Sequence, residues 1–204
     1  MSLLIELFPG ILENERGAIP HWENKDRPWE LLSSGDAGLI SQITEINDGE
    51  TYIHPDAKIG DFVTIEGPCY IGAGAEVRHS AYLRKGSWIC EGAVVGHSTE
   101  VKNSILLPGS KAPHFNYVGD SIMGIDANIG AGAKLSNVRN DRREVFVSLR
   151  DGERFGSGLR KFGALIGDKS QLGCNVVTNP GTFIAPGSMI GPNETVGGWV
   201  EVKS

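Results

Sequence analysis

A histidine in a polar neighbourhood is the first candidate for chemistry in this sequence. His114 is accompanied by Lys111, Asn116 and Tyr117, so a cation, an amide and a phenol stand close to the imidazole in the chain. An imidazole titrates near neutral pH and can take a proton from an incoming nucleophile. A lone surface histidine is usually no more than solvated, but this set suits recognition of a polar substrate and general-base catalysis.

The elements that must position these residues follow a six-residue period. A helix repeats every 3.6 residues and a strand every 2, so a period of six indicates one short strand plus one turn. Three such hexapeptides make one triangular coil, and we predict an all-β parallel β-helix of hexapeptide repeats. An aliphatic residue recurs at ten successive sixth positions: Ile53, Ile59, Ile65, Ile71, Val77, Leu83, Ile89, Val95, Val101 and Leu107.

The period is interrupted twice within a predicted repeat domain of residues 51–204. After Leu107, residues 108–116 break the register, which resumes in a new phase at Tyr117, Met123, Ile129 and Leu135. Residues 137–163 form the second break, in which Asp151-Gly152 follows a strand-like run and favours a hairpin. We predict loop insertions at both places. Function is expected there, because the repeat core does not require them.

Residues 1–50 lack the repeat and are predicted to form a small helical cap or arm over the first coil. Residues 28–32, which follow Asp26, begin like a helix, and residues 36–43 suggest a second one. Trp22 and Trp29 are expected to pack in this cap rather than to bind a ligand.

The composition of the chain restricts the kinds of partner it can bind and the cellular compartment in which it is expected. The chain has 204 residues and a formal net charge of −6, which argues against a nucleic-acid coat protein. Its three cysteines are far apart and form no paired motif, so a reducing cytoplasm is expected, without disulfides. No signal-like start and no apolar run of membrane-spanning length occurs.

The segment around His114 resembles a known family. Residues 111–120 (KAPHFNYVGD), followed by residues 128–132 (NIGAG), look like the acetyltransferase half of the bifunctional glucosamine-1-phosphate acetyltransferase and N-acetylglucosamine-1-phosphate uridyltransferase. The spacing matches without a gap through Asn137, and the hexapeptides extend the resemblance over roughly residues 53–196. Residues 158–168 look more like the related sugar-phosphate nucleotidyltransferase-related proteins. The resemblance implies a left-handed coil and a homotrimer.

The same resemblance implies a role for each matching residue. His114 falls on the catalytic base, and acetyl-CoA is the implied acyl donor, with no metal. Ala131 and Cys174 fall on positions that contact acetyl-CoA. The positions implied to hold the amino sugar and its phosphate are Arg84, Lys102, Tyr117, Asn128, Asn137 and Lys161.

Coil geometry and elementary chemistry are consistent with these implied roles. Arg84 and Lys102 are separated by three hexapeptides, so they should stack one coil above the other as a phosphate clamp. An amine must lose a proton to attack a thioester, and a backbone N–H in the turn of residues 130–132 could stabilise the oxyanion. Two departures from the family are Val138, where an aromatic residue is usual, and a longer arginine-rich insertion before Lys161.

Two other interpretations stay open. His79 and His97 are also separated by three hexapeptides, and His114 follows after one position less, so three histidines could gather around zinc as in hexapeptide carbonic anhydrases. Alternatively, the coil could be a non-catalytic trimerising or regulatory domain. Binding of acetyl-CoA and of hexosamine phosphates would separate the enzyme from the structural domain.

Overall fold

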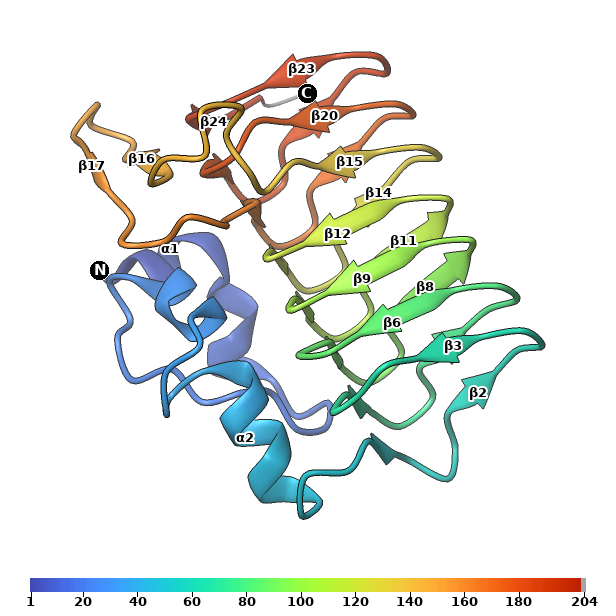
Figure 1. Cartoon of the computed structure of the whole chain (residues 1–204). Helices are drawn as coiled ribbons and strands as arrows, with labels where there is room; N and C mark the ends of the chain where they lie inside the picture. Colours follow the sequence, from blue (N-terminus) through green and yellow to red (C-terminus); the bar gives the residue numbers. More distant parts are fainter. Residues whose placement is uncertain (203–204) are drawn as a thin grey trace.

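The computed structural model describes residues 1–202 and shows a coil with three sides, each of them a parallel sheet (Figure 1). Sheet 1 consists of β1 (Tyr52–Ile53), β4 (Tyr70–Ile71), β7 (Trp88–Ile89), β10 (Ile105–Leu106), β13 (Ile122–Met123), β18 (Ala164–Ile166), β21 (Thr182–Ile184) and β24 (Trp199–Val200). Sheet 2 consists of β2 (Lys58–Ile59), β5 (Glu76–Val77), β8 (Val94–His97), β11 (Lys111–His114), β14 (Asn128–Ile129), β19 (Gln171–Leu172) and β22 (Met189–Ile190). Sheet 3 consists of β3 (Thr64–Ile65), β6 (Tyr82–Arg84), β9 (Glu100–Lys102), β12 (Tyr117–Gly119), β15 (Lys134–Leu135), β20 (Val177–Thr178) and β23 (Thr195–Val196). The predicted parallel β-helix is confirmed, and its left-handed sense stays a prediction.

The six-residue period is explained by a core that runs along the coil axis. Each inward aliphatic side chain stacks on its counterpart one coil away, as Ile71 does on Ile89 and Leu83 on Val101. Small residues allow the backbone to turn closely beneath the next coil. A Cβ atom added to Gly96 would lie 1.6 Å from the carbonyl oxygen of Pro113, so only glycine fits there.

The prediction of a loop insertion at residues 108–116 is wrong. This segment contains β11, a regular strand of sheet 2 whose Ala112 pairs with Val95. Leu106 pairs with Ile89 on one side and with Met123 on the other, so each of two successive coils is one position shorter than three hexapeptides. The register changes because the coil is shortened twice, without the addition of a loop.

Two inward positions change as a consequence. Leu106, not Leu107, faces the axis of the coil, and Leu107 is buried on the outer side. Val118, not Tyr117, is the next inward residue of sheet 3. The sequence does not reveal the shift because aliphatic residues occupy both positions, so the sixth-position pattern continues through Leu107 by coincidence.

The insertion at residues 137–163 contains the expected hairpin. Its strands β16 (Phe146–Ser148) and β17 (Arg154–Gly156) pair antiparallel across the turn that holds Asp151 and Gly152. The hairpin packs back on the molecule, because Val145, Val147 and Phe162 are fully buried against the N-terminal segment.

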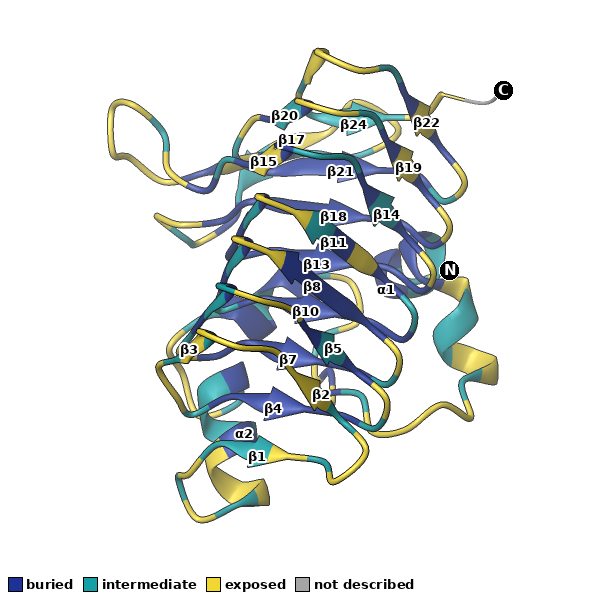
Figure 2. Ribbon diagram, turned by 90° about the vertical axis from the view of Figure 1, so that its right-hand side faces the viewer, coloured by how far each residue is buried: buried dark blue, intermediate teal, exposed yellow. Residues whose placement is uncertain are grey.

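Residues 1–50 form a brace along the side of the coil rather than a cap over its first turn. The brace comprises α1 (Leu3–Leu7), the 3₁₀ helices η1 (Pro9–Glu13) and η2 (Pro28–Leu32), and α2 (Leu39–Ile46). It covers the outer face of sheet 1, whose strands are buried for most of their length (Figure 2). The helices expected near residues 28–32 and 36–43 are present, whereas α1 was not predicted. No helix among residues 1–202 has the length and apolar character that crossing a bilayer requires.

The two tryptophans of the brace are buried, as predicted, but only one has a hydrogen-bond partner. Trp29 stacks on both Phe162 and Phe183, with ring centroids 5.8 and 5.6 Å away, and donates its indole N–H to the carbonyl of Ser157 at 3.0 Å. The indole N–H of Trp22 is buried without an acceptor among residues 1–202.

Replacing Trp29 with phenylalanine should therefore cost more than the same change at Trp22. Both variants lose similar apolar area, but only Trp29→Phe loses a hydrogen bond, worth about 1 kcal/mol. Urea denaturation of the two variants measures the difference in the free energy of unfolding. Equal losses would show that the bond to Ser157 contributes nothing.

Candidate functional site

His114 lies at a corner of the coil, where β11 ends and the chain turns from sheet 2 to sheet 3. Phe115 turns the corner in left-handed backbone, with φ of 36°. The Asn116 side chain holds this turn, because its Oδ1 accepts the His114 N–H at 3.0 Å and its Nδ2 donates to the Gly130 carbonyl at 2.7 Å. The imidazole is exposed and has no hydrogen bond or ion pair with any of residues 1–202. A fixed backbone thus presents a ring that is free to meet a substrate.

Three successive coils place a histidine at this corner, as the spacing suggested. His97 and His79 stack with ring centroids 5.4 Å apart, and their Nδ1 atoms are separated by 3.3 Å. The backbone of His114 is in register with that of His97. A zinc site needs three or four ligands that converge on one point. Within residues 1–202, no group of three His, Cys, Asp or Glu side chains is placed to share a metal ion.

A buried carboxylate, Asp120, joins several predicted site residues at the corner between sheets 3 and 1. It accepts hydrogen bonds from the Lys102 ammonium at 2.9 and 3.0 Å and from the Asn103 amide at 2.9 Å. The Asn137 amide donates to it as well. Sequence reasoning found Lys102 and Asn137 but gave Asp120 and Asn103 no role. The signal was present, since Asn103, Asp120 and Asn137 follow one another at intervals of one shortened coil, and Lys102 directly precedes Asn103.

Tyr117 stands beside this cluster on β12, opposite Glu100 of β9. Burial raises the pKa of its phenol, and the nearby carboxylates of Asp120 and Glu100 raise it further. A hydrogen bond with Asn137 acts in the opposite direction. The pKa of a free tyrosine is already near 10, so the phenol is a neutral hydrogen-bonding group at pH 7.

Arg84 and Lys102 stack in register on neighbouring strands of sheet 3, as their spacing predicted. Each faces a carboxylate of the same chain. The Arg84 guanidinium lies 2.9 Å from Glu100, and the Lys102 ammonium lies 2.9 Å from Asp120. Carboxylates therefore balance both charges, and the use of the pair as a phosphate clamp stays a prediction. Arg84 keeps guanidinium N–H groups that have no partner among residues 1–202.

The remaining two sugar-binding candidates lie apart. Lys161 forms an antiparallel bridge with Val138, the residue after Asn137, so it is next to the sheet 3 cluster. Asn128 begins β14 in sheet 2, where its strand neighbours are Lys111 and Gln171. Within a single chain, five of the six candidates therefore lie on sheet 3 or in the insertion of residues 137–163, whereas Asn128 lies on sheet 2.

Ala131 and Cys174 occupy the same corner as His114 in the two following coils. The N–H of Gly132 donates to the His114 carbonyl at 3.0 Å, and that of Asn175 donates to the Ala131 carbonyl at 2.8 Å. The three residues therefore form one continuous edge. Their assignment to acyl-donor contacts stays a prediction, but the edge places both positions beside the candidate base.

The turn predicted to stabilise an oxyanion has little donor capacity left. The N–H groups of Gly130 and Gly132 already donate to backbone carbonyls. Among residues 1–202, the Ala131 N–H has no acceptor. Ala131 is thus the member of this turn that could donate to a reaction intermediate.

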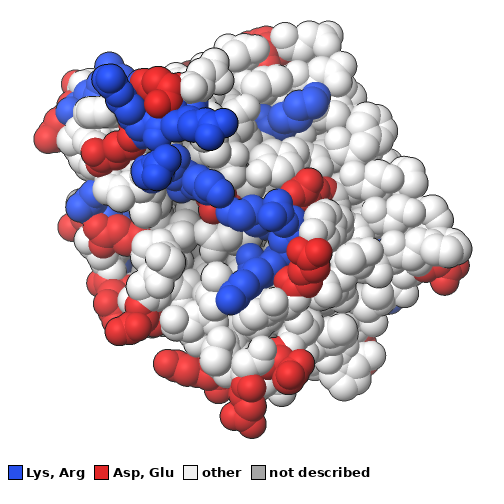
Figure 3. All heavy atoms as spheres, in the orientation of Figure 1, with Lys and Arg blue, Asp and Glu red and all other residues white. Residues whose placement is uncertain are grey.

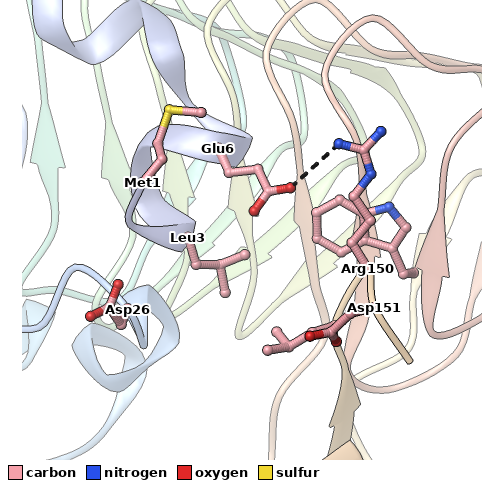
Figure 4. A pocket seen from close by; sticks show the side chains of 8 residues that line it. Met1, Leu3, Glu6, Asp26, Arg150 and Asp151 are labelled. Carbon is pink, nitrogen blue, oxygen red and sulfur yellow. Dashed lines mark ion pairs between the residues drawn. The ribbon is translucent and has the colours of Figure 1, made fainter. Parts of the chain in front are cut away.

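A cavity of about 540 Å³ lies away from all of these residues, between α1, the hairpin turn and β24 (Figure 4). Arg150 reaches across it, 3.8 Å from Glu6 and 2.9 Å from Glu201. This arginine of the insertion thus ties the hairpin to both ends of the described chain. No residue proposed for chemistry lines this cavity.

Comparison with known proteins gives a consistent picture. The family model described as the GMPPB C-terminal domain matches residues 65–150. A bifunctional sugar-1-phosphate nucleotidylyltransferase/acetyltransferase from Sulfurisphaera tokodaii is 37% identical over 188 residues, which cover 86% of this chain and 46% of the relative. A bifunctional protein GlmU from Methanococcus aeolicus is 34% identical over 202 residues, covering 90% of this chain and 46% of the relative.

The chain thus spans somewhat less than half the length of these relatives. Among solved structures, the acetyltransferase domain of PglB from Neisseria gonorrhoeae aligns with 93% of this chain and 77% of its own length, at 16% identity and a TM-score of 0.38. Repeat, fold and relatives together identify this chain as a hexapeptide-repeat protein homologous to the bifunctional sugar-1-phosphate nucleotidylyltransferase/acetyltransferases.

Proposed function

We propose that this chain transfers an acetyl group from acetyl-CoA to the amine of an amino-sugar phosphate resembling glucosamine-1-phosphate. The observation that carries the proposal is the exposed imidazole of His114, which has no partner among residues 1–202 and is held on a fixed turn inside a motif that such enzymes share. The relative from Sulfurisphaera tokodaii is a bifunctional sugar-1-phosphate nucleotidylyltransferase/acetyltransferase, which supports the same reaction class.

In the proposed reaction, the amine nitrogen attacks the thioester carbonyl carbon while His114 takes the proton of the amine. The carbon–sulfur bond then breaks, CoA leaves as a thiol after gaining a proton, and an amide forms. The Ala131 N–H is the proposed donor to the oxyanion, along an edge that continues to Cys174. Tyr117 and Asn137 offer neutral hydrogen bonds to the sugar. We also propose a homotrimer, in which Asn128 of one copy would face the site of another.

A coupled assay of CoA release tests this function with a panel of amino-sugar phosphates. Binding of acetyl-CoA at one hundred times its Kd should stabilise the fold by about 2.7 kcal/mol. That corresponds to a rise in Tm of roughly 5–10 °C for a chain of this size. Turnover with no member of the panel, together with no stabilisation by acetyl-CoA, would refute the proposal.

A non-catalytic regulatory domain is the second candidate. It is favoured by one observation, that Arg84 and Lys102 are each ion-paired within the chain, as structural residues would be. This candidate predicts no rise in Tm with either acetyl-CoA or hexosamine phosphates. A rise with both ligands and no CoA release would indicate binding without catalysis.

A further inference from the structure

Basic side chains gather in a band across the face on which β6, β9, β12 and β15 lie (Figure 3). Part of this band surrounds a cavity of about 460 Å³ at the base of the insertion, lined by Val138, Arg142, Arg160 and Lys161. We call this cavity the insertion pocket. Three of its four lining residues are cations, on a chain whose formal net charge is −6.

The backbone of the insertion pocket is held in place by the fold. Val138 and Lys161 bridge the two ends of the insertion, and the Phe162 N–H donates to the Asn137 carbonyl at 2.9 Å. The Arg160 Nε donates to the carbonyl of Arg142 at 3.3 Å, which links the two arginines. Phe162 itself is fully buried. The cations therefore surround a site that is formed before any ligand arrives.

Within the described part of the chain, the cations of the insertion pocket have no acidic partners. Among residues 1–202, none of the Arg142, Arg160 and Lys161 side chains forms an ion pair. The nearby acids are engaged elsewhere, since Asp141 pairs with Arg139 at 2.6 Å and Glu144 accepts the Gly158 N–H. Three unbalanced positive charges around one cavity repel one another, and a bound anion removes that repulsion.

We propose that the insertion pocket binds a diphosphate group, which narrows the amino-sugar phosphate of the proposed function to an amino sugar whose phosphate is part of a diphosphate, as in a nucleoside-diphosphate sugar. A diphosphate presents two adjacent phosphoryl groups, each with a negative charge, and so has oxygens enough for two guanidinium forks and an ammonium, whereas a monophosphate presents only one such group. The pocket begins at Val138, directly after Asn137, so a sugar at Asn137 places its phosphates there. The identity of the sugar rests on the proposed function, but anion binding by the pocket does not.

Isothermal titration with inorganic pyrophosphate and with inorganic phosphate tests the pocket on the whole chain. We expect pyrophosphate to bind at least ten-fold more tightly than phosphate. The double variant Arg142→Gln/Arg160→Gln should lose at least ten-fold in pyrophosphate affinity, since each charge-assisted contact is worth about that factor. The matched control is Arg139→Gln, an arginine of the same insertion that is paired with Asp141 and does not line the pocket. It should bind pyrophosphate like the wild type.

The inference is overturned if the two anions bind equally, if neither binds, or if the control loses as much affinity as the double variant. CoA release distinguishes this failure from failure of the proposed function. Suppose that the wild type does not bind pyrophosphate and that the double variant acetylates a sugar monophosphate with an unchanged kcat/KM. The pocket proposal would then be refuted, and the proposed acetyl transfer would stand. Conversely, tight pyrophosphate binding by a chain that acetylates none of the amino sugars tested would refute the proposed function and leave anion binding by the pocket in place.

Discussion

Replacing His114 with alanine should lower kcat for acetyl transfer by about 10²–10⁴, the usual contribution of a general base. The fold should be unaffected, because the ring is exposed and has no partner among residues 1–202, and the Asn116 side chain that fixes the turn contacts the backbone of His114 and not its ring. Single-turnover measurement of CoA release, at saturating acetyl-CoA and acceptor, isolates the chemical step from binding.

The matched control for this variant is His79→Ala. His79 stands at the same corner two coils earlier and is also exposed, but it lies outside the proposed site. The His79→Ala variant should keep the wild-type kcat and should fold like His114→Ala. An unchanged kcat in His114→Ala, or an equal loss in both variants, would show that the imidazole of His114 is not the base.

Replacing Asp120 with alanine should cause the largest loss of stability among the charged residues of the site. The change removes the acceptor of the Lys102 ammonium and of the Asn137 amide, and leaves the Asn103 amide only its hydrogen bond to the Leu32 carbonyl. Removing one partner of a buried pair typically costs about 3–5 kcal/mol. Because Lys102 keeps some access to water, we expect a loss at the lower end of that range, measured by urea denaturation.

Two further variants separate the charge effect from the packing effect. Asp141→Ala removes an exposed ion pair with Arg139 and should cost much less stability than Asp120→Ala, because solvent screens exposed charges. The double variant Asp120→Leu/Lys102→Met removes both buried charges together and should recover much of the lost stability. If the double variant is less stable than Asp120→Ala, then the unpaired charge of Lys102 is not the reason why Asp120→Ala loses stability.

The sequence was sufficient to predict the coil because the period of six leaves few alternatives. Ten aliphatic positions in register require strands so short that only a three-sided coil can bury them. The shortening of the coil at Leu106 could not be seen, because Leu107 continues the pattern equally well. The course of the brace was also hidden, since Trp29 and its partners follow no repeat and their contacts lie far away in the chain.

The candidate site was predicted only in part, for a related reason. The resemblance gave roles to Lys102, Tyr117 and Asn137, whereas Asp120, the last residue of the matching segment 111–120, received none, although its carboxylate connects them. Spacing could have found Asp120, because it lies one full coil from both Asn103 and Asn137, and residues at that separation lie above one another. The insertion pocket had no such signal. Its cations come together only because the ends of the insertion meet at Val138 and Lys161.

The brace along sheet 1 changes how this molecule should come apart. In a bare solenoid each coil touches only its neighbours, so the ends fray and the array unfolds piecemeal. Here the brace contacts strands from Tyr70 to Phe183, and the carboxylate of Asp168 accepts the N–H groups of both Gly10 and Ile125. Coils that never meet are thereby coupled through a common partner. The backbone amides of these coils should consequently lose their protection from hydrogen exchange together, as one cooperative unit along the length of the protein.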